Sequence, residues 1–153
     1  MSTILLQQRE KDAQRRFQAE GARALAAAAA EPGAVTTKGG LVLLTEREGS
    51  GQKPCEFDTV KVHYEGRLVD GTVFDSSYKR GAPLEFALDS VIAGWTEGLQ
   101  LMAPGGKARL TIPSNLGYGS MGAPPRIPGD ATLIFDVELL SVKGTAEEPD
   151  IFE

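Results

Sequence analysis

The chain has 153 residues, of which 41% are apolar, and it carries a formal net charge of −5 at pH 7. This length accommodates one domain with its own hydrophobic core plus an extension, and leaves no room for a second enzyme domain. Because the charge balance is acidic and Cys55 is the single cysteine, we expect neither a nucleic-acid partner nor a disulfide, a metal or a cofactor.

The first predicted element is a helix over residues 3–30. Its composition, rich in Ala, Glu, Arg and Gln, has high helix propensity, and Pro32-Gly33 ends it. This break divides the chain into three predicted parts: a helical extension over 1–33, a domain over 34–144 and an acidic tail over 145–153.

The sequence leaves the partner of this helix open. Its apolar stripe, formed by Ile4, Leu5, Phe17 and Leu25 among alanines, is too thin to predict a coiled coil. Self-association into a homodimer, docking on the following domain and free projection into solvent therefore stay as alternatives.

The beginning of the chain lacks the pattern of a targeting segment. Charged residues follow from Arg9 onward, and the apolar run over 24–30 is too short to cross a bilayer. We expect a cytoplasmic protein without a membrane partner. The alternative is a periplasmic or secreted protein from which a signal peptide has been removed.

From Gly40 onward, apolar residues recur at every second position between turn-forming residues, which predicts a mainly antiparallel sheet. Asp70-Gly71 adds the signal of a hairpin. The alternating positions are Val60, Val62 and Tyr64, then Ala108, Leu110 and Ile112, then Leu133, Phe135, Val137 and Leu139.

Between residues 91 and 102 the period becomes helical. The apolar positions are Val91, Ile92, Trp95, Leu99 and Met102. A sheet with one apolar face needs a cover, and this segment is the internal candidate, so we predict an α+β fold with one short helix on the concave face of the sheet. Gly94 and Gly98 each cost such a helix about 1 kcal/mol relative to alanine, which favours a close approach of backbone or ligand there.

Eight of the ten aromatic residues fall within the predicted domain. Taken singly, each is more typical of a hydrophobic core than of a binding site. Asp75, followed by two serines, is by itself more typical of a turn or a helix cap. The sole histidine, His63, lies on the polar face of its strand without a nucleophile in a recognisable motif, and we interpret it as structural.

Read together, several short motifs carry more information. They are VHYEG, DGTVFDSS, VIAGWTEGL, LTIP, YGS and ATLIFDVELL, all between residues 62 and 142. In this order they resemble the FKBP family of peptidyl-prolyl cis-trans isomerases over more than half of the sequence. The resemblance implies a twisted antiparallel β-sheet wrapped around one short helix, and isomerisation of X-Pro bonds without a covalent intermediate. The N-terminal helix is similar to that of Mip-like bacterial members.

The resemblance also implies a site. Its catalytic residues would be Asp75, Tyr118, Trp95 and Phe135, and its substrate-binding residues Tyr64, Phe74, Leu84, Phe86, Val91, Ile92 and Ile127. Trp95 would form the floor of a proline pocket, the Ile92 N–H and the Tyr118 hydroxyl would bind peptide carbonyl groups, and Ile127 would complete the rim.

Three rim positions depart from the common pattern of the family: Leu84, Ala123 and Arg126. They bear on the preference for the residue before proline and on macrolide ligands of the rapamycin class, and leave the proline pocket intact. The expected partners are proline-containing peptides and unfolded or folding proteins. The alternative function is a proline-peptide binding module or folding chaperone with little turnover.

Overall fold

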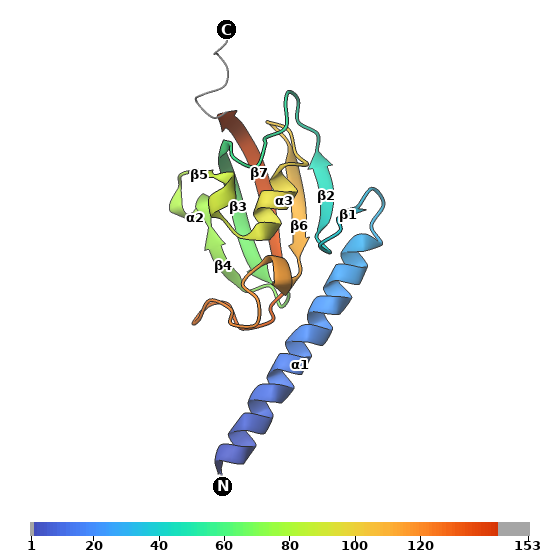
Figure 1. The fold of residues 1–153 in the computed structure, drawn as a ribbon, viewed down its shortest axis with the longest axis vertical. Helices are drawn as coiled ribbons and strands as arrows, with labels where there is room; N and C mark the ends of the chain where they lie inside the picture. Colours follow the sequence, from blue (N-terminus) through green and yellow to red (C-terminus); the bar gives the residue numbers. More distant parts are fainter. Residues whose placement is uncertain (1, 144–153) are drawn as a thin grey trace.

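The computed structural model describes residues 2–143 (Figure 1). Along the chain it contains α1 (Ser2–Ala29), β1 (Val35–Thr36), β2 (Val42–Arg47), β3 (Thr59–Leu68), β4 (Val73–Ser76), α2 (Ser77–Arg80), β5 (Leu84–Ala87), the 3-10 turn η1 (Leu88–Ser90), α3 (Ala93–Leu99), β6 (Lys107–Ile112), the 3-10 turn η2 (Ser114–Leu116) and β7 (Leu133–Lys143). The acidic tail predicted over 145–153 lies outside the described residues.

Within residues 2–143, seven strands form one antiparallel sheet in the order β1-β2-β6-β7-β3-β4, with β5 paired to β3. The long strands β3 and β7 lie side by side at its centre, with Val62 opposite Leu139 and Gly66 opposite Phe135. In both strands buried and less buried residues alternate, because successive side chains point to opposite faces. This confirms the strands predicted from the period of two.

Helix α3 packs across one face of the sheet and closes the core (Figure 1). A Cβ on Gly94 would lie 2.6 Å from Ile112 Cγ2, and one on Gly98 would lie 3.1 Å from the Leu110 methyl groups. The two glycines therefore bring the helix backbone close to strand β6, which is the close approach that their cost in the helix indicated. The helix is shorter than the predicted 91–102, because Val91 has an extended backbone and Ile92 is the N-cap residue.

The short helix α2 was not predicted. It is held at both ends: the Ser76 hydroxyl accepts a hydrogen bond from the Lys79 N–H, and Gly81 ends it with a φ of 80°. Four residues are too few to give a helical period in the sequence. This turn of helix places Arg80 next to β4.

Helix α1 docks on the opposite face of the sheet through its C-terminal half. Gly21 lies against Thr132, so closely that a Cβ there would be 2.3 Å from the Thr132 hydroxyl, and Gln18 donates a 3.2 Å hydrogen bond to Asp130. Alanines of the last turns face Val42 and Ile134 of the sheet. The N-terminal half runs beyond the sheet (Figure 1). Of the three alternatives for the helix, docking therefore describes its second half.

The fold is the predicted α+β class, with a twisted antiparallel sheet, one covering helix and an N-terminal helical extension. A contiguous core of buried aliphatic and aromatic side chains fills the space between α3 and the sheet. No helix over residues 2–143 combines the length and apolar character needed to span a membrane.

Candidate functional site

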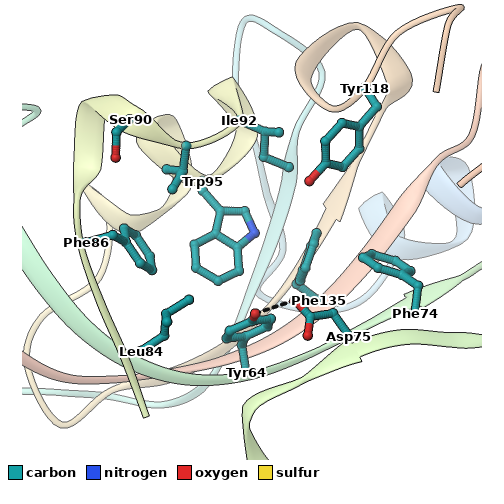
Figure 2. Close-up of a pocket in the computed structure, with 11 residues that line it drawn as sticks. Tyr64, Phe74, Asp75, Leu84, Phe86, Ser90, Ile92, Trp95, Tyr118 and Phe135 are labelled. Atoms are coloured by element: carbon teal, nitrogen blue, oxygen red, sulfur yellow. Dashed lines mark hydrogen bonds between the residues drawn. The ribbon is translucent and has the colours of Figure 1, made fainter. Parts of the chain in front are cut away.

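A cavity of about 470 Å³ opens between α3, the sheet and the loop that follows η2 (Figure 2). Its volume is in the range of small-ligand sites. The lining residues come from strands β3, β4, β5 and β7, the segment 90–95 and the loop after η2: Tyr64, Phe74, Asp75, Leu84, Phe86, Ser90, Val91, Ile92, Trp95, Tyr118 and Phe135.

Trp95 forms the floor of this cavity. Its ring meets the Tyr64 ring edge-to-face at 5.0 Å and the Phe135 ring at 5.1 Å, with interplanar angles of 87° and 86°. Phe86 contacts it from the other side at 5.3 Å. Edge-to-face contacts of this kind fix aromatic rings relative to one another. The walls are therefore pre-organised, with Trp95 only 5% exposed.

The indole N–H of Trp95 is buried and has no hydrogen-bond partner among residues 2–143. A buried donor without a partner costs about 1–3 kcal/mol. The face of the indole, held by the rings around it, offers a flat and mainly apolar surface suited to a small saturated ring.

Gly66 makes room for two of the walls. It lies opposite Phe135 on β7, and a Cβ at this position would lie 2.6 Å from Phe135 and 2.7 Å from Phe74. Any side chain would therefore displace both rings, which meet each other edge-to-face at 5.5 Å. Sequence reasoning did not single out Gly66, although the glycine in VHYEG interrupts an otherwise regular strand, which is a signal of close approach.

The polar side of the cavity is a cluster of three side chains. Tyr64 donates its hydroxyl hydrogen to one oxygen of Asp75, and Arg80 donates to the other oxygen. Arg80 also donates to the Tyr64 hydroxyl at 3.1 Å, and its guanidinium lies over the Tyr64 ring, 5.7 Å from the centroid. Asp75 is therefore held on both oxygens at the edge of the cavity.

These contacts decide how the groups titrate. Burial by itself would raise the pKa of Asp75, but the hydrogen bonds from Tyr64 and Arg80 outweigh it and hold this pKa below its usual value. Burial, and then the Asp75 carboxylate, raise the pKa of Tyr64. Burial and Asp75 also raise the pKa of Tyr118, which places its hydroxyl within the field of that carboxylate. At neutral pH the site thus holds one anion between two neutral hydroxyls.

Two groups at the mouth can bind a peptide backbone. Ile92 is the N-cap residue of α3, and its N–H has no acceptor among residues 2–143. The Tyr118 ring stands on the other side of the mouth, with its hydroxyl turned toward the cavity (Figure 2). A donor on each side can hold the two carbonyl groups that flank a bound ring.

Ten of the eleven residues proposed from the sequence line this one cavity, and their individual roles stay predictions. The exception is Ile127, which we expected at the rim. It is 4% exposed and belongs to the core cluster beneath the loop, where its backbone exchanges two hydrogen bonds with Ala123. Ser90 lines the cavity but was not proposed; its hydroxyl donates to the Ala87 carbonyl at 2.7 Å.

The other chemistry-bearing residues lie apart from the cavity. His63 stacks on Tyr78 at 4.6 Å and shares a 2.7 Å hydrogen bond with Ser77, in keeping with its interpretation as structural. Cys55 is a free, exposed thiol. The described part of the chain contains no group of three or more His, Cys, Asp or Glu side chains arranged to hold a metal ion.

Comparison with known proteins agrees with this geometry. The family model for FKBP-type peptidyl-prolyl cis-trans isomerases matches residues 50–140, more than half of the chain. A probable FKBP-type peptidyl-prolyl cis-trans isomerase of Haemophilus influenzae is 54% identical over 113 residues, which cover 74% of this chain and 47% of the relative. FkpA of Escherichia coli K12, named as an isomerase of the same type, is 53% identical over 75% of this chain and 42% of its own. The chain thus spans about half the length of these curated relatives.

Solved structures show the same fold. The crystal structure of FkpA from Escherichia coli matches with a TM-score of 0.85 and 46% identity, over 90% of this chain and 64% of that one. A peptidyl-prolyl cis-trans isomerase from Pseudomonas syringae matches with a TM-score of 0.74 and 40% identity, over 86% of this chain and 92% of that one. The chain therefore belongs to the family of FKBP-type peptidyl-prolyl cis-trans isomerases.

Proposed function

We propose that this chain is an active peptidyl-prolyl cis-trans isomerase that binds the proline ring of a peptide on Trp95. The observation that carries the proposal is the cavity itself, which has an indole as its floor, aromatic walls, one held carboxylate at the edge and a donor without a protein partner in residues 2–143 on each side of the mouth. Family membership supports the same activity.

The chemistry needs no covalent step. Rotation about an X-Pro bond is opposed by amide resonance, with a barrier of about 18–20 kcal/mol. The twisted amide has lost this resonance and carries less charge separation than the planar amide. A cavity with Trp95 as its floor and Phe135 and Tyr64 among its walls therefore disfavours the planar ground state relative to the transition state, which is catalysis by differential binding.

The polar groups have separate tasks in this proposal. The Ile92 N–H and the Tyr118 hydroxyl hold the carbonyl groups on either side of the proline while the prolyl amide rotates. Asp75, kept ionised by its two donors, supplies a fixed field at the edge of the cavity and orders Tyr64. Each 1.36 kcal/mol gained in this way gives about tenfold in rate.

A protease-free isomerisation assay on a neutral Leu-Pro peptide tests the proposal with the full chain. Loss of the indole in Trp95→Leu should raise KM more than it lowers kcat, whereas Asp75→Leu should mainly lower kcat. If kcat falls by the same factor and KM rises by the same factor in the two folded variants, this division of roles is overturned. A folded wild-type chain that accelerates no X-Pro peptide would overturn the proposed function.

A second function, gripping unfolded proline-containing segments with little turnover, is favoured by the apolar rim of the cavity. Leu84 is 41% and Tyr118 40% exposed, although both are large and apolar or aromatic and both line the cavity. Exposed apolar groups around a pocket are typical of surfaces that bind partners. Suppression of the aggregation of an unfolded, proline-containing client at full strength in Asp75→Leu, in which turnover should be low, would support this second function.

We also propose that macrolides of the rapamycin class bind in this cavity, since its aromatic floor and walls are those of the proline site. Leu84 and Arg126 stand at two of the rim positions that depart from the common family pattern and should weaken this binding. Inhibition of isomerisation by rapamycin, titrated against the wild-type chain and Leu84→Phe, measures the effect. The same inhibition constant in both proteins would show that Leu84 has no part in it.

Assembly and location are two further proposals. A homodimer would form through the half of α1 that runs beyond the sheet, because the other half is occupied by docking. Sedimentation equilibrium of the full chain tests it, and a monomer at all concentrations would exclude it. For location we propose the cytoplasm, with the periplasm as the alternative, to be distinguished by fractionation of the native cells.

A further inference from the structure

We propose that Arg126 selects peptides with an acidic residue beside the proline, at the side of the mouth formed by Phe74 and Tyr118. The inference rests on the proposed isomerase function and adds a preference among its substrates. Arg126 is one of the rim positions at which this chain departs from the common pattern of its family, and the mechanism makes no use of it.

The structure places the Arg126 guanidinium beside the cavity. Its Nη1 donates a 2.9 Å hydrogen bond to the Phe74 carbonyl, across 52 positions of the sequence. Phe74 lines the cavity, and the next residue is Asp75. The loop that carries Arg126 is pinned on both sides of it, because Ile127 is buried and exchanges backbone hydrogen bonds of 2.8 and 3.1 Å with Ala123. The hydrogen bond to Phe74 thus places the guanidinium at the rim, although the side chain is exposed.

The charge of Arg126 is not compensated nearby. Its hydrogen bond goes to the neutral carbonyl oxygen of Phe74, and no carboxylate within residues 2–143 forms an ion pair with it. Asp75 is already paired with Arg80. Asp130, at the far end of the same loop, accepts a hydrogen bond from Gln18 of α1. Within residues 2–143, Arg126 is therefore a cation at the Phe74 side of the mouth that no carboxylate pairs with.

The opposite side of the mouth has no cation among the residues that line it, which are Leu84, Phe86, Ser90 and Val91 (Figure 2). Asp89 is exposed next to Ser90 there. Glu85 is paired with Lys61 across β5 and β3 and points, like Lys61, away from the cavity. A peptide that crosses the mouth thus meets a cation at one flank of its proline only, so an acidic side chain is favoured on the Phe74 flank.

The guanidinium has donors left for such a ligand. Arginine presents five N–H donors in a planar fork, and the bond to Phe74 uses one of them. The others can take a carboxylate, with two oxygens if the peptide side chain is long enough. At an exposed rim, attraction between unit charges about 6 Å apart changes affinity by about threefold and is screened by salt.

The test compares kcat/KM of the full chain on peptides that differ by one charge. One pair carries Glu or Gln before the proline and a second pair carries Glu or Gln after it, with a neutral Leu-Pro peptide as reference. We expect Glu to exceed Gln by about threefold in one of the two pairs at low salt, and this ratio to approach one near 1 M salt.

Three variants assign the ratio to Arg126. Arg126→Gln should abolish it, whereas Arg126→Lys, which keeps the charge, should keep most of it. Lys61→Gln removes an equal charge from the face of β3 that points away from the cavity, and should leave the ratio unchanged. If Arg126 only anchored the loop, Arg126→Gln would change kcat/KM by the same factor for all peptides and leave the ratio of Glu to Gln unchanged.

The outcomes separate this inference from the function on which it rests. Equal rates for Glu and Gln in both pairs, or a ratio that persists in Arg126→Gln, would overturn the selection of acidic residues while the Leu-Pro peptide is still isomerised. A folded chain that accelerates none of the peptides would overturn the isomerase itself, and the inference with it.

Discussion

Tyr64 keeps Asp75 ionised, and this gives a prediction about pH. The folded-state pKa of Asp75 lies below its ordinary value, so its contribution to stability is present above the unfolded-state pKa and is lost as the pH falls through the folded-state pKa. Tyr64→Phe removes one donor and should raise the pKa of Asp75. We therefore expect the acid limb of kcat/KM to move to higher pH, and kcat/KM at pH 7 to fall about fivefold, for about 1 kcal/mol of lost hydrogen bonding.

Tyr78→Phe is the matched control for this experiment. The Tyr78 hydroxyl donates to Glu138 at 3.3 Å and does not line the cavity. Tyr78→Phe should therefore show the same dependence of kcat/KM on pH as the wild-type chain. A Tyr64→Phe profile that coincides with that of Tyr78→Phe would show that the Tyr64 hydroxyl does not control the charge of Asp75.

Gly66 leads to a prediction about packing. A Cβ there would lie within 3 Å of both Phe74 and Phe135, and both rings belong to the buried core cluster. Gly66→Ala should therefore lower the free energy of unfolding by about 1–3 kcal/mol and lower kcat/KM as the cavity walls shift. Chemical denaturation and the Leu-Pro assay measure the two effects.

A double variant checks the cause. Phe74→Leu shortens one of the two rings, so Gly66→Ala should cost less in the Phe74→Leu background than in the wild type, with a coupling energy of about 0.5 kcal/mol or more. Additive losses in the double variant would mean that the alanine acts on the strand backbone and not on the rings.

Single residues also show how far sequence reasoning reaches. The aromatic walls and Asp75 could be proposed because motifs along the chain carry them. Arg80 could not, since its contact with Asp75 depends on a helical turn too short to have a period. Ser90 was missed for a related reason, because the turn before α3 decides what it touches. Gly66 did interrupt a regular strand, but the strand pairing, and not its neighbours along the chain, decides that Phe135 and Phe74 are the rings it approaches.

At the scale of elements, helix propensity and packing favour different residues at Gly94 of α3: propensity favours alanine, whereas packing against the sheet favours glycine. Alanine in place of glycine stabilises an exposed helix interior by about 1 kcal/mol. Gly94, however, faces Ile112 at a distance of 2.6 Å from a built Cβ, and Gly98 faces Leu110 and Leu41 at 3.1 Å or more. We expect Gly94→Ala to destabilise the protein by about 1–3 kcal/mol, and Gly98→Ala to be close to neutral.

Urea unfolding of the two variants under the same conditions measures which of them has the lower free energy of unfolding. Because both changes add one methyl group to the same helix, each is the control of the other for propensity. A gain of stability in Gly94→Ala would mean that α3 can move away from β6, and that the close approach of helix and sheet is not required.

Element boundaries were harder to predict than elements. The apolar period pointed to a helix over 91–102, but the regular turns begin at Ala93. The two residues before it are extended, and this places Val91 and Ile92 on the wall of the cavity. The hydrophobic period marks which residues are buried on one side, and it does not distinguish a helical residue from an extended one that faces the same core.

At the scale of the whole molecule, the sequence left the role of α1 open because its apolar stripe was weak. The structure shows why a weak stripe suffices: Gly21 and the alanines after it allow the helix backbone to approach the sheet, so contact is made with small side chains. A pattern of large apolar residues was the signal sought, and close packing through small residues does not produce it. The side chains of Leu5 and Phe17, on which the self-association alternative depended, lie outside the described residues.

Docking of α1 can be tested at Gly21. Gly21→Leu would push a side chain into Thr132 and should detach the second half of the helix from the sheet. Ala22→Leu is the matched control, because Ala22 is exposed on the next position of the same helix. We expect Gly21→Leu to lower the free energy of unfolding by about 1–3 kcal/mol, and Ala22→Leu to change it by less than about 0.5 kcal/mol.

Hydrogen exchange gives the more direct measurement. Amide groups over 21–29 should lose protection in Gly21→Leu and keep it in Ala22→Leu, while isomerisation of a Leu-Pro peptide stays at the wild-type rate in both, because the cavity lies on the opposite face of the sheet. Unchanged amide protection over 21–29 in Gly21→Leu would show that this part of the helix is stable without contact with the sheet. A loss of activity in that variant alone would mean instead that α1, from behind the sheet, supports the strands that carry the aromatic walls.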